Sequence, residues 1–149
     1  DLWLPGASVL NRGTQFLRQS PQVTLTIPST ASRAITVGAY DARRQVYADF
    51  SGRGFLRNLD LVKPDLVAPG CDIISCNRMV RPSDAPYTIK SGTSMSTPMV
   101  AGAVACLLEK YPYLTNAQVK LRLRDSCLRI KMPDNKQGWG LLCMEKLMR

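Results

Sequence analysis

Histidine is absent from all 149 residues of this chain. In Ser-His-Asp enzymes an imidazole accepts the serine proton, so a complete triad of that kind is excluded within these residues. The five cysteines contain no Cys-x-x-Cys pair and have no histidine to join them, so we expect no zinc site, no other metal and no cofactor. Their odd number argues against a closed disulfide framework, although it allows a single bridge.

Long apolar runs are also missing. No stretch reaches the roughly 20 apolar residues that a membrane-spanning helix needs, so no membrane span is expected. The first residues, Asp1-Leu2-Trp3-Leu4-Pro5, do not form a signal peptide, and no methionine begins the chain. We therefore expect a processed chain or an excised segment of a longer protein.

Basic residues outnumber acidic ones by 20 to 11, which gives a formal net charge of +9. A nucleic-acid-binding protein concentrates such residues on one face or in one tract, whereas here they are scattered along the sequence. We therefore expect no nucleic-acid partner. The excess is better explained by a solvated surface, or by an acidic part of the protein outside these residues.

The pattern of apolar residues predicts a domain that mixes strands and helices. With 45% hydrophobic residues the chain is long enough for one domain with a sizeable core. Strands are predicted at 23–27, 34–40, 46–51, 64–69, 71–75 and 86–90, and helices at 99–109, 115–126 and 141–147. Thr115 and Gln118 have the spacing of a capping box for the second helix.

The most informative stretch, residues 91–102, joins the last predicted strand to the first predicted helix. A sharp turn through small residues exposes one side chain and directs the first free N–H groups of the helix at the same point. We expect Pro98 in the first helical turn, close backbone packing at Gly102, and Cys106 in the core. A serine here could be a nucleophile beside an oxyanion site, but a Ser/Thr-rich turn before a helix is more often just an N-cap.

The motif itself favours the nucleophile. Gly92-Thr93-Ser94-Met95-Ser96-Thr97-Pro98, followed by Val100-Ala101-Gly102, resembles the serine signature of the subtilisin-like proteases, or subtilases. Upstream, Pro64-Asp65-Leu66-Val67-Ala68-Pro69-Gly70 resembles the block that precedes this signature in the family, and Gly138-Trp139-Gly140 resembles the family's last glycine turn.

This resemblance implies a fold and a set of site residues. The fold would be α/β, with residues 23–149 forming the C-terminal half of a subtilase catalytic domain, built on a mainly parallel, doubly wound sheet with flanking helices. Ser94 would be the catalytic serine and its backbone N–H an oxyanion donor. Gly92 and Thr93 would bind substrate, as would Ile27, Pro28 and Ser29 at the floor of the specificity pocket.

Residues 1–22 have two interpretations. One bacterial branch of the family, the clostridial Csp-type proteases, inserts a β-rich domain just before the region that residues 23–149 resemble, and residues 1–22 resemble the tail of that domain. The other interpretation is a linker. The family's Asp, His and oxyanion Asn segments belong to the first half of the domain and have no counterpart here. The resemblance therefore implies a peptide or protein substrate and a complementary N-terminal half as partner. The segment alone is expected to be inactive.

Two alternatives remain open at this stage. The chain could be a non-catalytic pseudoprotease or truncated scaffold that binds a protein partner, because it lacks the proton acceptor. A Ser-Lys pair with Lys90 is a less favoured route to activity, since a lysine on the incoming strand is usually a solvated charge. Half of such a sheet would also leave strand edges and an apolar face uncovered, which predicts poor folding alone or self-association.

Overall fold

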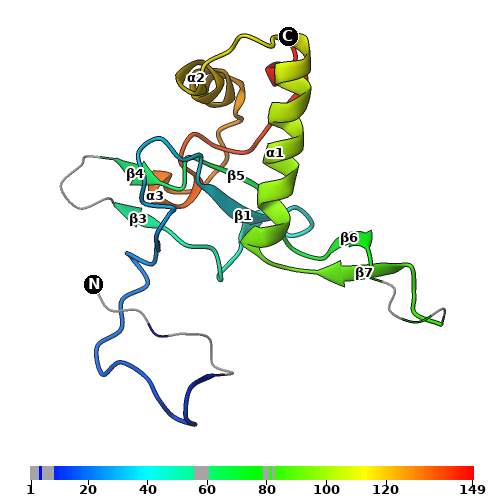
Figure 1. The fold of residues 1–149 in the computed structure, drawn as a ribbon. Coiled ribbons are helices and arrows are strands. Elements are labelled where there is room, and N and C mark those ends of the chain that lie inside the picture. Colours follow the sequence, from blue (N-terminus) through cyan, green and yellow to red (C-terminus); the bar gives the residue numbers. More distant parts are fainter. Residues whose placement is uncertain (1–3, 5–8, 56–60, 79–80, 82) are drawn as a thin grey trace.

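A computed structural model describes residues 4, 9–55, 61–78, 81 and 83–149. Its central sheet has the order β2-β1-β5, with β1 (Val37–Asp41) in the middle, β2 (Val46–Tyr47) antiparallel to it and β5 (Leu66–Pro69) parallel (Figure 1). The parallel register pairs Val37 with Leu66 and Tyr40 with Pro69. Both strands are buried apart from residues at their ends, as the short apolar runs in the sequence predict.

The second edge of β5 is covered by a segment near the C-terminus. The Val67 amide donates to Gly140 O at 2.9 Å, and the Leu142 amide donates to Val67 O at 3.0 Å. Leu141 also bridges to Leu128. The prediction of a helix at 141–147 is therefore wrong in its first half, because Leu141 and Leu142 extend beside β5 and α4 begins only at Met144 (Met144–Leu147).

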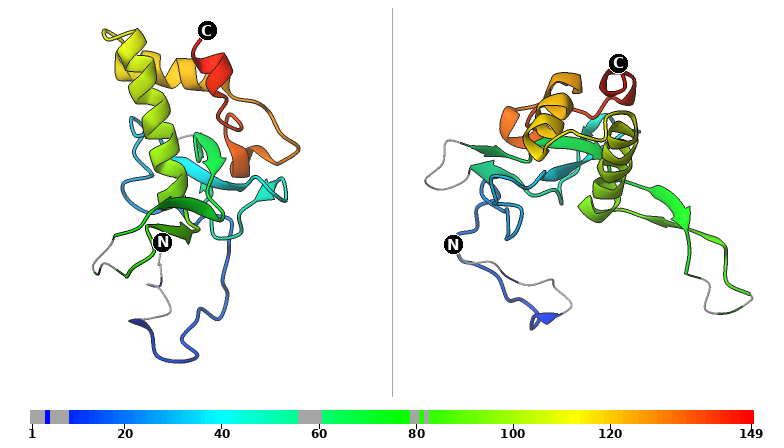
Figure 2. Two further views of the ribbon diagram at one scale, coloured as in Figure 1. Left: turned by 90° about the vertical axis from the view of Figure 1, so that its right-hand side faces the viewer. Right: turned by 45° about the horizontal axis from the view of Figure 1, so that its top comes forward.

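Two short two-stranded sheets lie beside the central one. One joins β3 (Gly54–Phe55) to β4 (Val62–Lys63), and the other is a hairpin of β6 (Ile73–Cys76) and β7 (Tyr87–Lys90) that projects away from the body (Figure 2). The two strands of this hairpin were predicted to within two residues, although their pairing was not. The strand predicted at 46–51 is shortened to its first two residues, and 23–27 forms no strand. That segment has polar residues or exposed side chains at most positions and runs beside Gly52–Gly54, with the Thr24 amide donating to Arg53 O at 2.9 Å.

Helix α1 (Thr93–Lys110) is longer than the predicted 99–109 and begins directly after Gly92. Its buried residues Ser96, Val100, Ala103 and Leu107 recur at helical spacing and face β1 and β5. Pro98 consequently lies in the second turn, so the prediction that it occupies the first turn is wrong. A proline at this position removes the amide hydrogen bond to the Ser94 carbonyl, in the first turn of the helix.

Helix α2 (Asn116–Ser126) has the predicted capping box: Thr115 accepts from the Gln118 amide, and the Gln118 side chain accepts from the Thr115 amide at 2.8 Å. Helix α2 packs against α4, while the short α3 (Asp134–Gln137) lies beside β3 and β4. None of the described helices is long and apolar enough to cross a membrane.

The core lies between α1, α2, α4 and the parallel strands. Its buried members are Leu66, Ala68, Val100, Ala103, Leu107, Val119, Leu123, Cys127 and Leu147. Burial, with a smaller effect of neighbouring Cys143, raises the pKa of the Cys127 thiol to about 12. Cys127 therefore stays protonated near neutral pH and behaves as a small core residue.

The outer side of α1 is exposed. Pro98, Ala101, Gly102 and Ala105 follow one another at helical spacing and all are exposed, as is Cys106 next to them. The predictions of a buried Cys106 and of close packing at Gly102 are therefore wrong for the described residues: a Cβ placed on Gly102 would meet nothing within 4 Å. An apolar stripe of small residues on the outer side of a helix is unusual for a surface helix, whose outer side normally carries charge.

Candidate active site

The start of α1 is tied to the end of β5. Strand β7 ends at Lys90, and the Gly92 amide donates to Gly70 O at 2.8 Å before the helix starts. Gly92 has φ 155° and ψ 159°, a conformation open essentially to glycine alone. The sharp turn predicted between strand and helix is therefore present, and a side chain at position 92 would strain it.

Ser94 is the second residue of α1, and its side chain is exposed. Its hydroxyl makes no hydrogen bond to any other described residue, and the amides of Thr93 and Ser94 likewise have no acceptor among those residues. The first turn of the helix contains no acidic residue. Once a base removes its proton, an open hydroxyl of this kind can attack a carbonyl carbon. The two free N–H groups, at the positive end of the helix, can stabilise the oxyanion that forms.

The floor beneath this turn is tightly packed. Ser96 is fully buried, and a Cβ built on Gly70 would lie 2.2 Å from Ser96 Oγ and 2.8 Å from Ala39 Cβ. Only a glycine at position 70 lets the end of β5 approach α1 this closely. The two glycines, 70 and 92, thus set where the exposed serine stands relative to the core.

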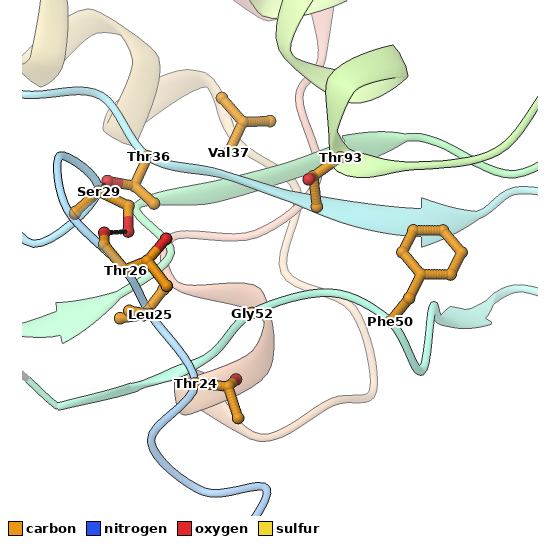
Figure 3. Close-up of a pocket in the computed structure, with 9 residues that line it drawn as sticks. All are labelled: Thr24, Leu25, Thr26, Ser29, Thr36, Val37, Phe50, Gly52 and Thr93. Atoms are coloured by element: carbon orange, nitrogen blue, oxygen red, sulfur yellow. Dashed lines mark hydrogen bonds between the residues drawn. The ribbon is translucent and has the colours of Figure 1, made fainter. Parts of the chain in front are cut away.

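A pocket of about 310 Å³ opens beside the start of α1, at Thr93, the residue before Ser94 (Figure 3). Thr93 contributes one wall, and the chain segments on the opposite side contribute the rest: Thr24, Leu25, Thr26, Ser29, Thr36, Val37, Phe50 and Gly52. Among the described residues its lining combines hydroxyl-bearing and apolar side chains and includes no charged one. Such a pocket suits an uncharged side chain of a ligand better than a charged one.

The residues expected to bind substrate are only partly brought together here. Thr93 and Ser29 line the pocket, and Ser94 follows Thr93 directly. Ile27 is 84% exposed and does not line the pocket, and neither does Pro28, which follows a cis peptide bond, or Gly92. Lys90 is exposed at the end of β7, and its side chain makes no hydrogen bond or ion pair with a described residue.

A charged cluster behind the pocket was not foreseen. Lys63 is 1% exposed, and its Nζ lies 2.5 Å from Asp65 Oδ2, with Lys120 Nζ 3.5 Å from the other carboxylate oxygen. Burial lowers the pKa of Lys63, and the hydrogen bond to Asp65 offsets part of that effect. The sequence carries only part of the signal: Lys63 and Asp65 flank a proline just before a buried strand, but nothing in it places Lys120 beside them.

Comparison with known proteins agrees with the motifs. The profile of the subtilase family, peptidase S8, matches residues 8–140, which is most of the chain. The chain belongs to the subtilase family. Subtilases are serine proteases, and the resemblance found in the sequence is thereby confirmed.

Individual subtilases are similar over much of the chain. Serine protease AprX of Bacillus subtilis (strain 168) is 34% identical over 138 residues, which cover 82% of this chain and 31% of AprX. Subtilisin E of the same organism is 39% identical over 103 residues, covering 69% of this chain and 24% of subtilisin E.

Among solved structures, the Clostridium perfringens CspB protease superposes with a TM-score of 0.80 at 36% identity, covering 91% of this chain and 30% of that protein. This subtilase chain therefore spans less than a third of the length of these three relatives. Its fold is α/β, as in the CspB structure.

Proposed function

We propose that this chain is the serine-bearing part of a subtilisin-like serine endopeptidase, with Ser94 as the nucleophile. The observation that carries the proposal is the exposed Ser94 hydroxyl at the open first turn of α1, next to the pocket that Thr93 lines. Oγ attacks the carbonyl carbon of the substrate peptide bond, and the carbonyl oxygen becomes an oxyanion facing the free amides. The C–N bond then breaks, an amine leaves, and water hydrolyses the acyl-serine.

The proton lost by Ser94 must go to a base, and this chain holds no imidazole. In the proposed mechanism a histidine, the aspartate that orients it and a side-chain oxyanion donor come from another part of the full-length protein. The acid form of that histidine returns the proton to the leaving amine. Residues 1–149 alone are then inactive, because a serine hydroxyl without a base is a poor nucleophile near neutral pH.

The same proposal extends to the fold. The parallel pair β1–β5 would be part of a larger, mainly parallel sheet with helices on both faces, and residues 23–149 its C-terminal half. Two features support this: the outer edge of β1 has no strand partner before Tyr40 among the described residues, and the small residues on the outer side of α1 are uncovered. A complementary N-terminal half would cover both.

A fluorophosphonate probe, which phosphorylates activated serines, tests the proposal. We expect stoichiometric labelling of the full-length protein at Ser94, none in Ser94→Ala, and none in residues 1–149 alone. Ser96→Ala is the matched control, because it removes a buried hydroxyl two residues further along the same helix and should keep the labelling. Labelling that persists in Ser94→Ala would exclude Ser94 as the nucleophile.

The alternative is a non-catalytic scaffold that binds a protein partner, and the absence of histidine favours it. The two proposals differ in one outcome. A well-folded full-length protein that takes up no probe at any pH between 6 and 10 would favour the scaffold, whereas labelling that rises through the pKa of an imidazole would favour the protease.

A further inference from the structure

We propose that the Lys63–Asp65–Lys120 cluster is a positioning device that holds the Ser29–Thr36 wall of the pocket in the shape that receives substrate. This inference rests on the proposed function, because it assigns the pocket beside Ser94 to substrate. It concerns residues that do not themselves line the pocket.

The wall has no regular secondary structure of its own to hold it. Residues 27–34 consist largely of turns, and β1 begins only at Val37. Short local hydrogen bonds close these turns, for example from the Ala31 amide to Pro28 O at 2.9 Å. A wall built from turns moves easily unless other elements fix it.

The cluster supplies those fixed points from three separate elements. Lys63 Nζ, at the end of β4, donates to Ala34 O at 2.9 Å. Lys120 Nζ, from α2, donates to Ser32 O at 2.8 Å and to Ala34 O at 3.1 Å. Both ammonium groups therefore bind the wall through its backbone carbonyls, whatever the side chains of the wall are.

Asp65 completes the arrangement at the start of β5. Its Oδ2 accepts the Thr36 amide at 2.7 Å in addition to Lys63 Nζ, and its own amide donates to Thr36 O at 2.8 Å. Thr36 Oγ1 in turn donates to Ser29 O at 2.7 Å. A continuous series of hydrogen bonds thus runs from the buried carboxylate to two residues that line the pocket, Thr36 and Ser29.

Charge explains why the wall is held firmly. Two ammonium groups meet one carboxylate, so one positive charge is left over in a site where Lys63 is almost completely buried. The carbonyl oxygens of Ser32 and Ala34 accept hydrogen bonds from these ammonium groups, and a displacement of the wall would break those bonds. Lys120 also lies over the ring of Trp139, whose centroid is 5.8 Å from Nζ.

The test uses the full-length protein with Lys120→Met, which removes one ammonium group but keeps the aliphatic stem. Lys131→Met is the matched control, because Lys131 is exposed and makes no hydrogen bond or ion pair with a described residue. For peptide substrates with a side chain that enters the pocket, we expect KM to rise roughly tenfold in Lys120→Met with kcat changed little. Labelling of Ser94 by a small fluorophosphonate, which does not use the pocket, should keep its wild-type rate.

A purely structural role would give a different pattern. Loss of kcat and of labelling in the same proportion as loss of folded protein, with KM unchanged, would overturn the proposal. Lys63→Met, which leaves Asp65 paired with Lys120, is the second variant and should change KM in the same direction.

Hydrogen exchange separates this proposal from the protease assignment. In Lys120→Met the peptide covering residues 29–36 should exchange on the order of tenfold faster than in wild type, while the α1 core stays protected. If the wild-type protein takes up no fluorophosphonate, the protease assignment fails, and faster exchange confined to 29–36 still supports the positioning role. Unchanged exchange there would overturn it.

Discussion

Ser96, two residues after Ser94 on α1, has a buried hydroxyl that affects the stability of the helix start. Its side chain is completely buried under the turn that carries Ser94, and its Oγ has no hydrogen-bond partner among the described residues. A buried hydroxyl without a partner costs about 1–3 kcal/mol of desolvation, and alanine is also the better helix former. The hydroxyl that faces solvent and the one that faces the core are two residues apart, yet their environments are opposite.

We therefore predict that Ser96→Ala raises the free energy of unfolding by about 1 kcal/mol, since it removes an unsatisfied polar group without opening a large cavity. Chemical denaturation of the two proteins side by side measures the effect. Ser75→Ala, on the exposed strand β6, is the control and should lie within roughly 0.5 kcal/mol of wild type. A loss of stability above that range in Ser96→Ala would show that Oγ has a hydrogen-bond partner after all.

Among the elements, the ones that local sequence defines were predicted best. The capping box of α2 and the apolar run of β5 follow from residues close together in the chain. The errors lie where distant segments decide the outcome. Leu141 and Leu142 would suit a helix, but pairing with Val67 and Leu128 extends them, and Val23–Ile27 finds no partner strand.

The residues of the candidate site fall into the same two groups, those that local sequence reveals and those that only the packing of distant segments brings together. Ser94 and its turn were recognisable from the motif, and Ser29 from the resemblance. The Lys63–Asp65–Lys120 cluster and pocket residues such as Phe50 were not, because nothing in the sequence places Lys63 beside Lys120, or Phe50 beside Thr93. Lys63 and Lys120 come together only because both side chains reach the carboxylate of Asp65, which directly precedes β5.

The contact between β5 and α1 yields a prediction. Gly70→Ala places a Cβ 2.2 Å from Ser96 Oγ, 2.8 Å from Ala39 Cβ and 3.0 Å from Gly92 O, so α1 must shift away from β5. We expect a loss of about 1–3 kcal/mol in the free energy of unfolding and slower fluorophosphonate labelling of Ser94. In the double variant Gly70→Ala/Ser96→Ala part of the loss should be recovered, because the shortest contact is gone. Strict additivity of the two changes would contradict this packing.

The molecule as a whole has an exposed apolar side and a strong positive charge. Ala101, Gly102 and Ala105 leave a smooth stripe along α1, and the formal net charge is +9. The stripe favours contact with another surface, whereas the charge opposes association of identical copies.

For residues 1–149 alone we predict self-association that strengthens with added salt, because salt screens the repulsion. Sedimentation velocity at low and high ionic strength measures it. Ala105→Lys should reduce the association, whereas Ala117→Lys, an equivalent change at an exposed position of α2, should have little effect. A chain that stays monomeric at high salt would contradict the prediction.

The hydrogen bond between Gly92 and Gly70 also has a consequence for evolution of the surface. The chain leaves the body at Gly70 and returns at Gly92. The hydrogen bond between these two glycines therefore closes the base of the segment 71–91, which contains β6 and β7. Because this base is fixed, the length of the segment can change in related sequences without moving Ser94. The hairpin is then free to diversify at little cost to the chemistry beside it.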